Sequence, residues 1–563
     1  MGGGGTERAS AMTLKGIRSG LAALALLSFG QAPAFASQTP ADRADPSVVE
    51  DELRPEELLE RPSRERPVVR SEARSEVAVS SSVVVGAIRI EGAEALPPAA
   101  FAAVISAYAG RLLSPSDMRA LASDVANVAR GAGYGLATAW IPPQRVSNGV
   151  LRVVIDEGRI DAIEAEGSAD GVARRLLAPL LHGRPVRTAE LERRLLLAGD
   201  VAGVWIGKAR LERRDGRNIL HVKTQRERVS GRAYLDNWGS STVGPVNLLL
   251  VADINGVAAD DDRLTISGVL TPLQPREFQL VRAGYQKGLG TNGTMIGVQA
   301  YVAHSRPGGV LSDRDIVGDS VEGSLGVSHP LLRSRAVSVW TGIEFTVRDS
   351  HQTLRDITLR EDRLATLTAS LLASARAGDG YLHGRVALVQ GTGAFDATRA
   401  GDLRASRADG SAIFTKLEAR ARYVRPLGGR FSLQLEGEGQ IASRPLLSSE
   451  EMGLGGRNFL RSYDYREASG DKGVAASAEI RFDLAKLPRP VKAAQLYGYA
   501  DAGSVGNYRD GRGGATLASA GGGARVSLGK FQSGLEIGFP LGDSPFSRGS
   551  RDPRVSFTLG ARF

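Results

Sequence analysis

The residue types that carry out chemistry form no catalytic or metal-binding motif in this 563-residue chain. Cysteine is absent, which excludes a disulfide framework, a thiolate metal site and a cysteine nucleophile. The histidines form neither an HExxH motif nor another paired-ligand spacing, and we find no convincing serine–histidine pair. The six histidines are His182, His221, His304, His329, His351 and His383. We therefore expect a protein that is not an enzyme and that uses no metal or cofactor.

One stretch late in the chain concentrates charged residues and glycines. It reads GLGGRNFLRSYDYREASGDKG and covers residues 453–473. The stretch is too polar for a core strand. It is also too rich in glycine for a helix, because glycine loses more backbone entropy on folding than any other residue. Alternating segments flank it on both sides, so its position depends on the elements that surround it.

From about residue 229 to residue 563 the chain consists of alternating segments rather than helices. Sixteen such segments run from VSGRAYLDNWG to PRVSFTLGARF. Short connections such as LGTN and GGR alternate with longer polar ones, for example residues 306–319, 349–362, 394–410 and 542–552. An even strand count with short and long connections is typical of a transmembrane β-barrel, which leaves no backbone group unpaired in lipid. The soluble alternatives are a β-sandwich and a propeller.

The last segment favours the membrane barrel. Apolar residues occupy the odd positions from Val555 to Phe563, and small or polar residues occupy the even positions. Alternation with a period of two places the odd set on one face of the strand. Phe557 and Phe563 are the aromatic residues of this face, and they are candidates for a terminal-strand signal.

The N-terminus has the pattern of an export signal over residues 1–36. Lys15 and Arg18 precede the apolar run GLAALALLSFG, and the sequence AFA at 34–36 is a small-x-small cleavage pattern. The run is too short to cross a bilayer as a helix, which needs about 20 residues. Met12 is an alternative start, because the residues that follow it make a better charged leader. We expect a protein that leaves the cytoplasm.

Residues 37–82 are rich in proline, glutamate and arginine. They contain one helical candidate at 46–61, which Pro55 interrupts. The many charges and the low apolar content favour a linker with little fixed structure.

Residues 83–226 contain one supersecondary pattern twice. Each copy has the order β-α-α-β-β, and the copies cover residues 83–158 and 159–226. In the first copy, Ser114 or Ser116 is a candidate N-cap for the second helix. A repeated unit of this kind indicates two small tandem domains.

The net charge of +9 does not by itself indicate a nucleic-acid partner. Arginine is scattered throughout the chain, and we find no basic stripe interleaved with stacking aromatics. We therefore expect no nucleic acid among the partners.

Several motifs resemble one known family. GYGLATAWIPPQRVSNGVLRVVIDEGRI, residues 133–160, resembles the end of the first POTRA (polypeptide-transport-associated) domain of two-partner secretion transporters, the TpsB or haemolysin-activator family. Residues 453–473 resemble the long sixth extracellular loop of these proteins. YGYADAGSV, residues 497–505, resembles the barrel strand that faces this loop. The resemblance covers nearly the whole mature chain.

The resemblance implies a mainly β transmembrane protein of the bacterial outer membrane. Two periplasmic β-α-α-β-β POTRA domains, at 83–158 and 159–226, would precede a C-terminal 16-stranded antiparallel β-barrel. The barrel would cover residues 227–563 and include a long loop at 447–473. In relatives an N-terminal helix plugs the pore, which implies this role for a helix within residues 37–82.

The resemblance also implies a tether inside the pore. The arginine at the tip of the family's sixth loop pairs with an aspartate of the facing strand, and the matching residues are Arg461 and Asp501. A guanidinium presents a planar fork to a carboxylate. The other motif positions are, in the loop, Leu460, Ser462, Tyr463, Gly470, Asp471 and Gly473 and, in the strand, Tyr499 and Gly503. The family usually has glycine where this chain has Ser462, which leaves the local backbone conformation open.

The implied function is a translocation pore that recognises and secretes a large TpsA-like partner protein in extended form. Outer-membrane lipids, the barrel-assembly machinery and periplasmic chaperones are the other implied partners. Whether the client is a haemolysin, an adhesin or another protein stays open, as does the oligomeric state. The candidate client-binding residues, for which core packing is the alternative, are Leu176, Leu177, Leu180 and Leu195. The alternative functions are a barrel-assembly insertase, which typically has more POTRA domains, and a passive porin, which has none.

Overall fold

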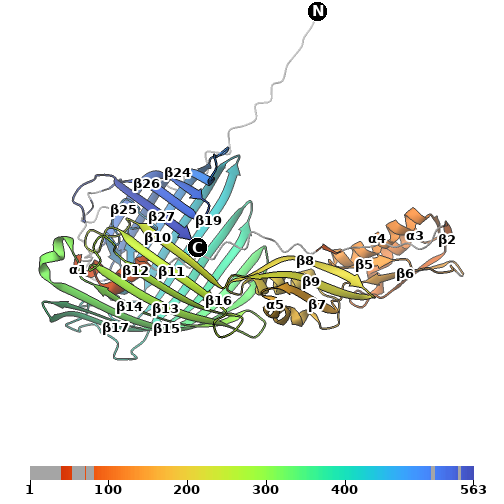
Figure 1. The fold of residues 1–563 in the computed structure, drawn as a ribbon, viewed down its shortest axis with the longest axis horizontal. Helices are drawn as coiled ribbons and strands as arrows, with labels where there is room; N and C mark the ends of the chain where they lie inside the picture. Colours follow the sequence, from red (N-terminus) through yellow and green to blue (C-terminus); the bar gives the residue numbers. More distant parts are fainter. Residues whose placement is uncertain are drawn as a thin grey trace, which may run out of the picture.

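The computed structural model describes residues 40–53, 70–71, 81–146, 148–508, 514–542, 545 and 547–563. The predicted signal peptide, both candidate start residues and Pro55 lie outside these residues. A large barrel forms one end of the molecule, and two small α/β domains extend from it as an arm (Figure 1). No helix of the described residues is both long and apolar enough to cross a membrane.

The barrel is closed and antiparallel, as the alternating segments predict. Its first and last strands pair with each other, from Arg232 opposite Arg562 to Asp236 opposite Thr558. Its sixteen strands are β10 (Val229–Asp236), β11 (Asn247–Asn255), β12 (Asp262–Leu270), β13 (Phe278–Leu289), β14 (Thr294–Ser305), β15 (Ile316–Arg333), β16 (Val337–Leu354), β17 (Ile357–Ala377), β18 (Gly380–Gly391), β19 (Thr415–Gly428), β20 (Phe431–Ala442), β23 (Lys472–Asp483), β24 (Val491–Gly506), β25 (Gly514–Leu528), β26 (Phe531–Pro540) and β27 (Arg554–Arg562).

The two faces of the wall differ in the way that a lipid-facing barrel requires. In β27, Val555 and Leu559 are exposed on the outside, whereas Ser556 is buried on the inside. Phe563, the terminal residue, is also exposed and continues the pairing, because its backbone N–H donates to the carbonyl of Gly231. Phe557 is partly buried. Exposed apolar side chains are stable here because the surrounding solvent is lipid.

One predicted loop is wrong. Residues 349–362 are polar, which favoured a long loop, but they form the ends of β16 and β17 around a two-residue turn at Arg355 and Asp356. Both turn residues have a positive φ, as the tight hairpin turn requires. Cross-strand pairs such as His351 opposite Glu361 continue the ladder. Strand pairing therefore overrides the local polarity. On the inner face Ser350 and Gln352 are buried, and their side chains donate to the Asp45 carboxylate and to the carbonyl of Ala41 in the N-terminal segment.

The first small domain contains a three-stranded sheet and two helices. Its sheet order is β3-β6-β5, with β3 parallel and β5 antiparallel to β6. Ser114 caps helix α4 in a capping box with Asp117, which settles the choice between the two candidate serines. The elements are β2 (Val83–Val85), β3 (Ala87–Glu91), η2 (Pro98–Phe101), α3 (Ala102–Tyr108), β4 (Arg111–Leu113), α4 (Pro115–Gly131), β5 (Thr138–Trp140) and β6 (Val150–Asp156).

The second small domain repeats this arrangement next to the barrel. Strand β7 runs parallel and β8 antiparallel to β9. A two-residue strand from the N-terminal linker, β1 (Arg70–Ser71), pairs in parallel with the outer edge of β8. The other elements are β7 (Ala162–Gly167), α5 (Asp170–Leu177), η3 (Ala178–Leu180), α6 (Thr188–Gly199), β8 (Val204–Arg214) and β9 (Arg217–Arg226).

Candidate functional site in the barrel lumen

The predicted loop folds back into the barrel. We call residues 443–471, between β20 and β23, loop L6. Its neck is a short antiparallel pair of β21 (Met452–Leu454) and β22 (Ala468–Gly470). Beyond the neck, Gly455 and Gly456 have φ of +105° and +103°, which favours glycine, and a Cβ on Gly455 would lie 2.1 Å from the carbonyl oxygen of Asp464. The tight return of the loop therefore depends on these two glycines.

Arg461 at the tip of L6 contacts Asp501 of β24. The guanidinium Nε lies 3.2 Å from Asp501 Oδ2, and Nη2 lies 3.2 Å from Oδ1, a two-point contact. The backbone N–H of Arg461 also donates to Oδ2 at 3.2 Å. Both residues are buried. Charge-assisted pairing of this kind is strong where bulk water is excluded.

Two further carboxylates contact Arg461, and neither is among the site residues predicted from the sequence. Nη1 lies 2.9 Å from Glu479 Oε2 and 3.4 Å from Glu536 Oε2. The guanidinium also stacks on the ring of Tyr499, 3.4 Å from its centroid. Glu479 lies on β23 and Glu536 on β26, both on inward-facing positions, so alternation identifies them as lumen residues. Only the pairing register of the strands brings them to Arg461.

The residues beside Arg461 fit closely against the wall. Leu460 and Tyr463 are buried, and the Tyr463 hydroxyl donates to the carbonyl of Ala518 at 3.2 Å. A Cβ added to Gly503 would lie 3.1 Å from Leu460 Cδ1, which is why a glycine suits this wall position. Ser462 has no positive φ, and it packs opposite Gly538. The conformation at Ser462 therefore does not require the glycine that the family usually has there.

The motif residues predicted in strand β24 point into the lumen. Tyr499, Asp501 and Gly503 are buried on the inside, whereas Ala500 and Ala502 are exposed on the lipid side. Alternation with a period of two is sufficient to set these orientations. A carboxylate on the lipid side would be costly, so the inward orientation is the stable one.

Two short helices from the N-terminal segment lie inside the barrel: α1 (Pro40–Arg43) and α2 (Pro46–Leu53) (Figure 1). The predicted helix at 46–61 therefore exists at least from residue 46 to residue 53. Asp42 pairs with Arg360 of β17, and Glu50 pairs with Arg282 of β13. Charge pairs join the helices to the polar inner wall, and Ala44 and Val49 also belong to a buried apolar cluster with wall residues such as Phe278.

The same N-terminal segment contacts loop L6. Arg43 Nη1 lies 3.4 Å from Glu467 Oε2, and Arg43 Nη2 donates to the Glu467 carbonyl oxygen at 3.2 Å. The Tyr465 hydroxyl donates to the carbonyl of Val48. The helices are therefore bound both by the wall and by the loop that carries Arg461.

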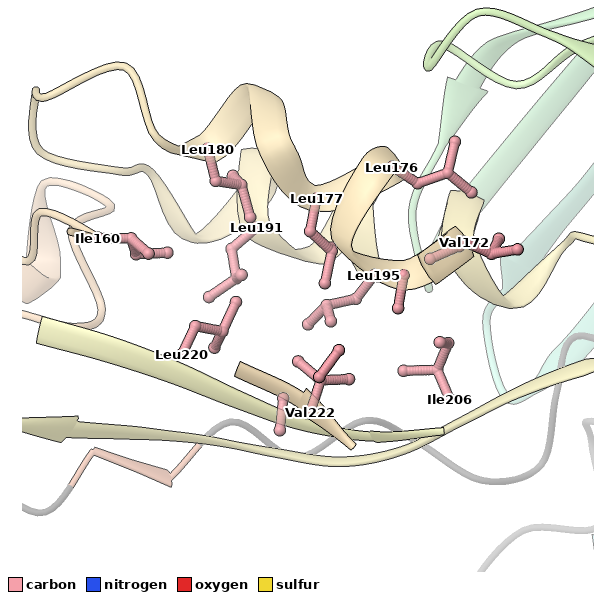
Figure 2. Packing of buried hydrophobic residues seen from close by; sticks show 14 of the residues in the cluster. Ile160, Val172, Leu176, Leu177, Leu180, Leu191, Leu195, Ile206, Leu220 and Val222 are labelled. Atoms are coloured by element: carbon pink, nitrogen blue, oxygen red, sulfur yellow. The ribbon is translucent and has the colours of Figure 1, made fainter. Parts of the chain in front are cut away.

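The four candidate client-binding leucines are core residues of the second small domain. Leu177, Leu180 and Leu195 point between the helices and the sheet, toward residues such as Leu220 (Figure 2). Leu176 points away from the sheet, toward the barrel (Figure 2), and lines a cavity of about 230 Å³ between this domain and the barrel. All four are buried, so Leu177, Leu180 and Leu195 are core residues rather than residues of an open groove, whereas Leu176 also lines the cavity. The apolar faces of the amphipathic helices α5 and α6 pack in the core of their own domain.

The described residues contain no cluster of three or more histidine, aspartate or glutamate side chains placed to hold a metal ion. The histidines make local contacts instead. His221, for example, lies between Glu164 and Glu212 on the sheet of the second small domain.

Comparison with known proteins gives this architecture a family. The family described as haemolysin secretion/activation protein ShlB/FhaC/HecB matches residues 216–526, and the ShlB-type POTRA domain matches residues 83–158. HuxB, a heme/hemopexin transporter protein of Haemophilus influenzae strain 86-028NP, is 24% identical over 409 residues, 70% of this chain and 71% of HuxB. The outer membrane transporter CdiB of Escherichia coli is 24% identical over 555 residues, 92% of this chain and 90% of CdiB.

Solved structures show the same fold. CdiB from Escherichia coli superposes with a TM-score of 0.72 at 21% identity, covering 94% of this chain and 100% of CdiB. BamA from Haemophilus ducreyi without its POTRA domains 1–3 superposes with a TM-score of 0.52 at 13% identity, covering 85% of this chain and 100% of that structure. With the lumen loop, the closed barrel and the two small domains in place, the chain belongs to the ShlB/FhaC/HecB haemolysin secretion/activation family, the outer-membrane transporters of two-partner secretion, with its POTRA domains in the periplasm.

Proposed function

We propose that this transporter carries one large exoprotein in extended form through the barrel lumen, after recognition by the POTRA domains. The observation that carries this proposal is the content of the lumen. Loop L6 and helices α1 and α2 contact the wall through side chains and are not strands of the barrel, so they can be displaced without breaking the barrel ladder. A passive porin needs neither these segments nor periplasmic domains.

Client recognition uses a sheet edge rather than the four leucines. The outer edge of β8 already accepts a strand, because β1 of the linker pairs there in parallel. An extended client can add to the same edge through its own backbone, as in other cases of strand addition. Since only Arg70 and Ser71 occupy the edge in the described residues, a longer client strand would form more hydrogen bonds and displace them.

The role that we propose for Arg461 is to hold L6 in the resting lumen. Its contacts with Asp501, Glu479 and Glu536 bind the loop tip to three strands of the wall. A lumen too wide for side chains alone to fill needs an internal support of this kind. The helices α1 and α2 complete the resting state as a plug, which the client has to displace.

Deletion of residues 83–158 tests the proposal. We expect loss of client secretion from a barrel that is still inserted in the membrane, because recognition precedes translocation. Secreted client is measured per folded transporter, and heat-modifiable migration on a gel reports the folded barrel. Normal secretion by the deletion variant would show that recognition lies outside the first POTRA domain.

A strain that lacks the whole transporter distinguishes the alternative function. A barrel-assembly insertase would affect the level of other outer-membrane proteins, whereas a secretion pore affects one client. We expect unchanged levels of other barrels after deletion of the whole transporter. Lipids of the outer membrane, the barrel-assembly machinery and periplasmic chaperones are the proposed partners during the transporter's own biogenesis, and the client can be a haemolysin, an adhesin or another exoprotein.

A further inference from the structure

The Gly-Asp-Lys-Gly sequence that closes loop L6 has no part in the tip contacts of Arg461. We propose that Asp471 is an outer anchor of L6, a positioning residue that joins three extracellular connections at the root of the loop and thereby lets Arg461 reach Asp501. The inference rests on the proposed role of Arg461, because it concerns what holds the other end of the same loop.

Asp471 is a fully buried carboxylate with a complete set of donors. Its Oδ1 accepts from the backbone N–H of Leu446 at 2.8 Å, and its Oδ2 accepts from the backbone N–H of Tyr508 at 2.8 Å. Leu446 belongs to the outgoing leg of L6, and Tyr508 belongs to the connection between β24 and β25. A buried carboxylate is stable only when it is paired in this way, so Asp471 fixes two backbone segments to each other.

Arg407 brings a third connection to the same carboxylate. It lies in the connection between β18 and β19, residues 392–414, and its Nη1 is 2.7 Å from Asp471 Oδ1. The same Nη1 is 2.8 Å from Glu451 Oε1, a buried carboxylate in the outgoing leg of L6 that also accepts from the Ser469 hydroxyl at 2.6 Å. Arg407 therefore links the outer connection to both legs of L6.

The glycines on either side of Asp471 explain the motif. A Cβ on Gly470 would lie 2.7 Å from the carbonyl oxygen of Gly506, and a Cβ on Gly473 would lie 2.6 Å from Val505 Cγ1. Neither glycine has a positive φ, so they serve close approach rather than a tight return of the backbone. Their absent side chains let the root of L6 lie directly on the outer end of β24.

The outer anchor at Asp471 and the inner anchor, which is the contact of Arg461 with Asp501, therefore lie along one strand, β24. Gly473 pairs with Val505, whereas Asp501 pairs with Ser477 further down β24. The four-residue spacing from 501 to 505 corresponds to about 14 Å along the strand. Because L6 is fixed to β24 at its root as well as at its tip, a shift of the root is transmitted to the tip through the loop between them.

Apolar packing supports the anchor, which makes a folded variant expected. Leu446, Leu447, Phe414 and Ala442 belong to a buried cluster that holds the 392–414 connection against the wall. The Tyr508 hydroxyl also donates to the carbonyl of Ala442 at 2.6 Å. Loss of the Asp471 carboxylate would leave this cluster in place while the root of L6 loses its polar contacts.

The chain provides a direct reporter because it contains no cysteine. Ser462 is fully buried, and its hydroxyl has no hydrogen-bond partner among the described residues, so Ser462→Cys removes no such contact. A maleimide can modify this cysteine in the full-length transporter, reconstituted in liposomes, only after the tip has left the wall. The labelling rate therefore measures the position of the loop tip without a client.

We expect Asp471→Ala to raise the labelling rate of Ser462→Cys about tenfold or more, since two backbone donors and Arg407 lose their acceptor. Asp471→Asn keeps one acceptor and should raise the rate less. The matched control is Asp409→Ala, which removes another of the carboxylates that Arg407 contacts, 2.7 Å from Arg407 Nε and partly exposed. This control should leave the rate unchanged.

Three outcomes decide between the anchors, with heat-modifiable migration reporting a folded barrel. If Arg461→Ala raises the labelling rate and neither Asp471 variant does, the outer anchor is refuted while the inner one stands. If Asp409→Ala raises the rate as much as Asp471→Ala, the effect belongs to Arg407 in general and the assignment to Asp471 is wrong. If the Asp471 variants raise the rate and Arg461→Ala does not, the proposed role of Arg461 fails separately.

Discussion

Replacement of Arg461 by alanine is the most informative perturbation of this transporter. The substitution removes four hydrogen bonds to carboxylates: two to Asp501, one to Glu479 and one to Glu536. It leaves Asp501 with the backbone N–H of residue 461 and a long contact from the Ser519 hydroxyl at 3.4 Å. The three carboxylates then lie close together on the wall without the cation that they share.

The size of the effect follows from burial. Removal of one partner of a buried pair costs about 3–5 kcal/mol, and lumen water favours the low end. A loss of about 3 kcal/mol in docking raises the released fraction of the loop tip by about two orders of magnitude. Asp501→Ala should cost less, about 1–2 kcal/mol, because Arg461 keeps Glu479 and Glu536. The two single variants are therefore unequal, although a simple Arg–Asp pair would predict equal defects.

Two assays test this expectation in a double-mutant cycle of wild type, Arg461→Ala, Asp501→Ala and the double variant. One measures secreted client per folded transporter, and the other measures maleimide labelling of Ser462→Cys. We expect a folded barrel with little or no secretion for Arg461→Ala, a smaller defect for Asp501→Ala, and a double variant no worse than Arg461→Ala, because the residues share one interaction. Arg461→Lys should restore docking only in part, since an ammonium lacks the planar fork.

The result that would refute the reasoning is simple multiplication of the two single defects in the double variant. The residues would then act independently, and the contact between them would be incidental. Equal labelling rates in wild type and Arg461→Ala would refute it as well, because they would show that the loop tip is held by packing around Leu460 and Tyr463 rather than by charge.

Three further predictions address the plug, the loop and the periplasmic side. Deletion of residues 38–62 should raise single-channel conductance in planar bilayers, because it removes the proposed plug. Unchanged conductance would contradict the plug. Gly455→Ala should release L6, because alanine is strained at φ +105° and its Cβ would lie 2.1 Å from a carbonyl oxygen. The control for backbone strain alone is Gly549→Ala, because Gly549 has a positive φ and open space around it. Equal labelling rates of Ser462→Cys in the two variants would contradict this explanation. Burial raises the pKa of Glu192, but its hydrogen bonds and charge pairing with Arg335 of the β15–β16 turn outweigh this and hold the pKa below its usual range. A carboxylate with a lowered pKa stabilises the contact between α6 and this turn at pH values above its usual pKa. This contribution is lost as the pH falls through the lowered pKa. Spin-label distances between α6 and that turn should therefore broaden below about pH 4.5, and Glu192→Gln should remove this acid dependence; an unchanged profile in the variant would exclude Glu192 as its source.

Ion pairs join the second POTRA domain to the barrel. Arg333 forms a two-point contact with Asp200 at 2.6 and 2.7 Å, and Arg175 lies 2.7 Å from Asp261. These pairs hold the second POTRA domain against periplasmic turns of the barrel. The edge of β8, which we propose as the client-binding edge, belongs to the domain that these pairs join to the barrel.

The sequence by itself determined the parts of this protein that follow local periodicity. Alternation with a period of two identified the barrel strands and placed Tyr499, Asp501 and Gly503 on the inner face, because strand geometry orients side chains whatever the partner strand. The repeated β-α-α-β-β pattern likewise identified two small domains before the barrel. The motif resemblance supplied Arg461 as the partner of Asp501, which local pattern alone could not do.

Only the tertiary structure decided which distant residues meet. Glu479 and Glu536 are ordinary alternating residues until strand register brings them to Arg461. The segment 349–362 has the composition of a loop, but pairing between β16 and β17 makes it a hairpin. Leu177 lies on an amphipathic helix that could equally have lined a groove, and the sheet beneath it made it a core residue. For Arg461 and Leu177 the deciding interaction joins residues far apart in the chain, where local sequence carries no information about the partner. For residues 349–362 it is strand pairing across a two-residue turn.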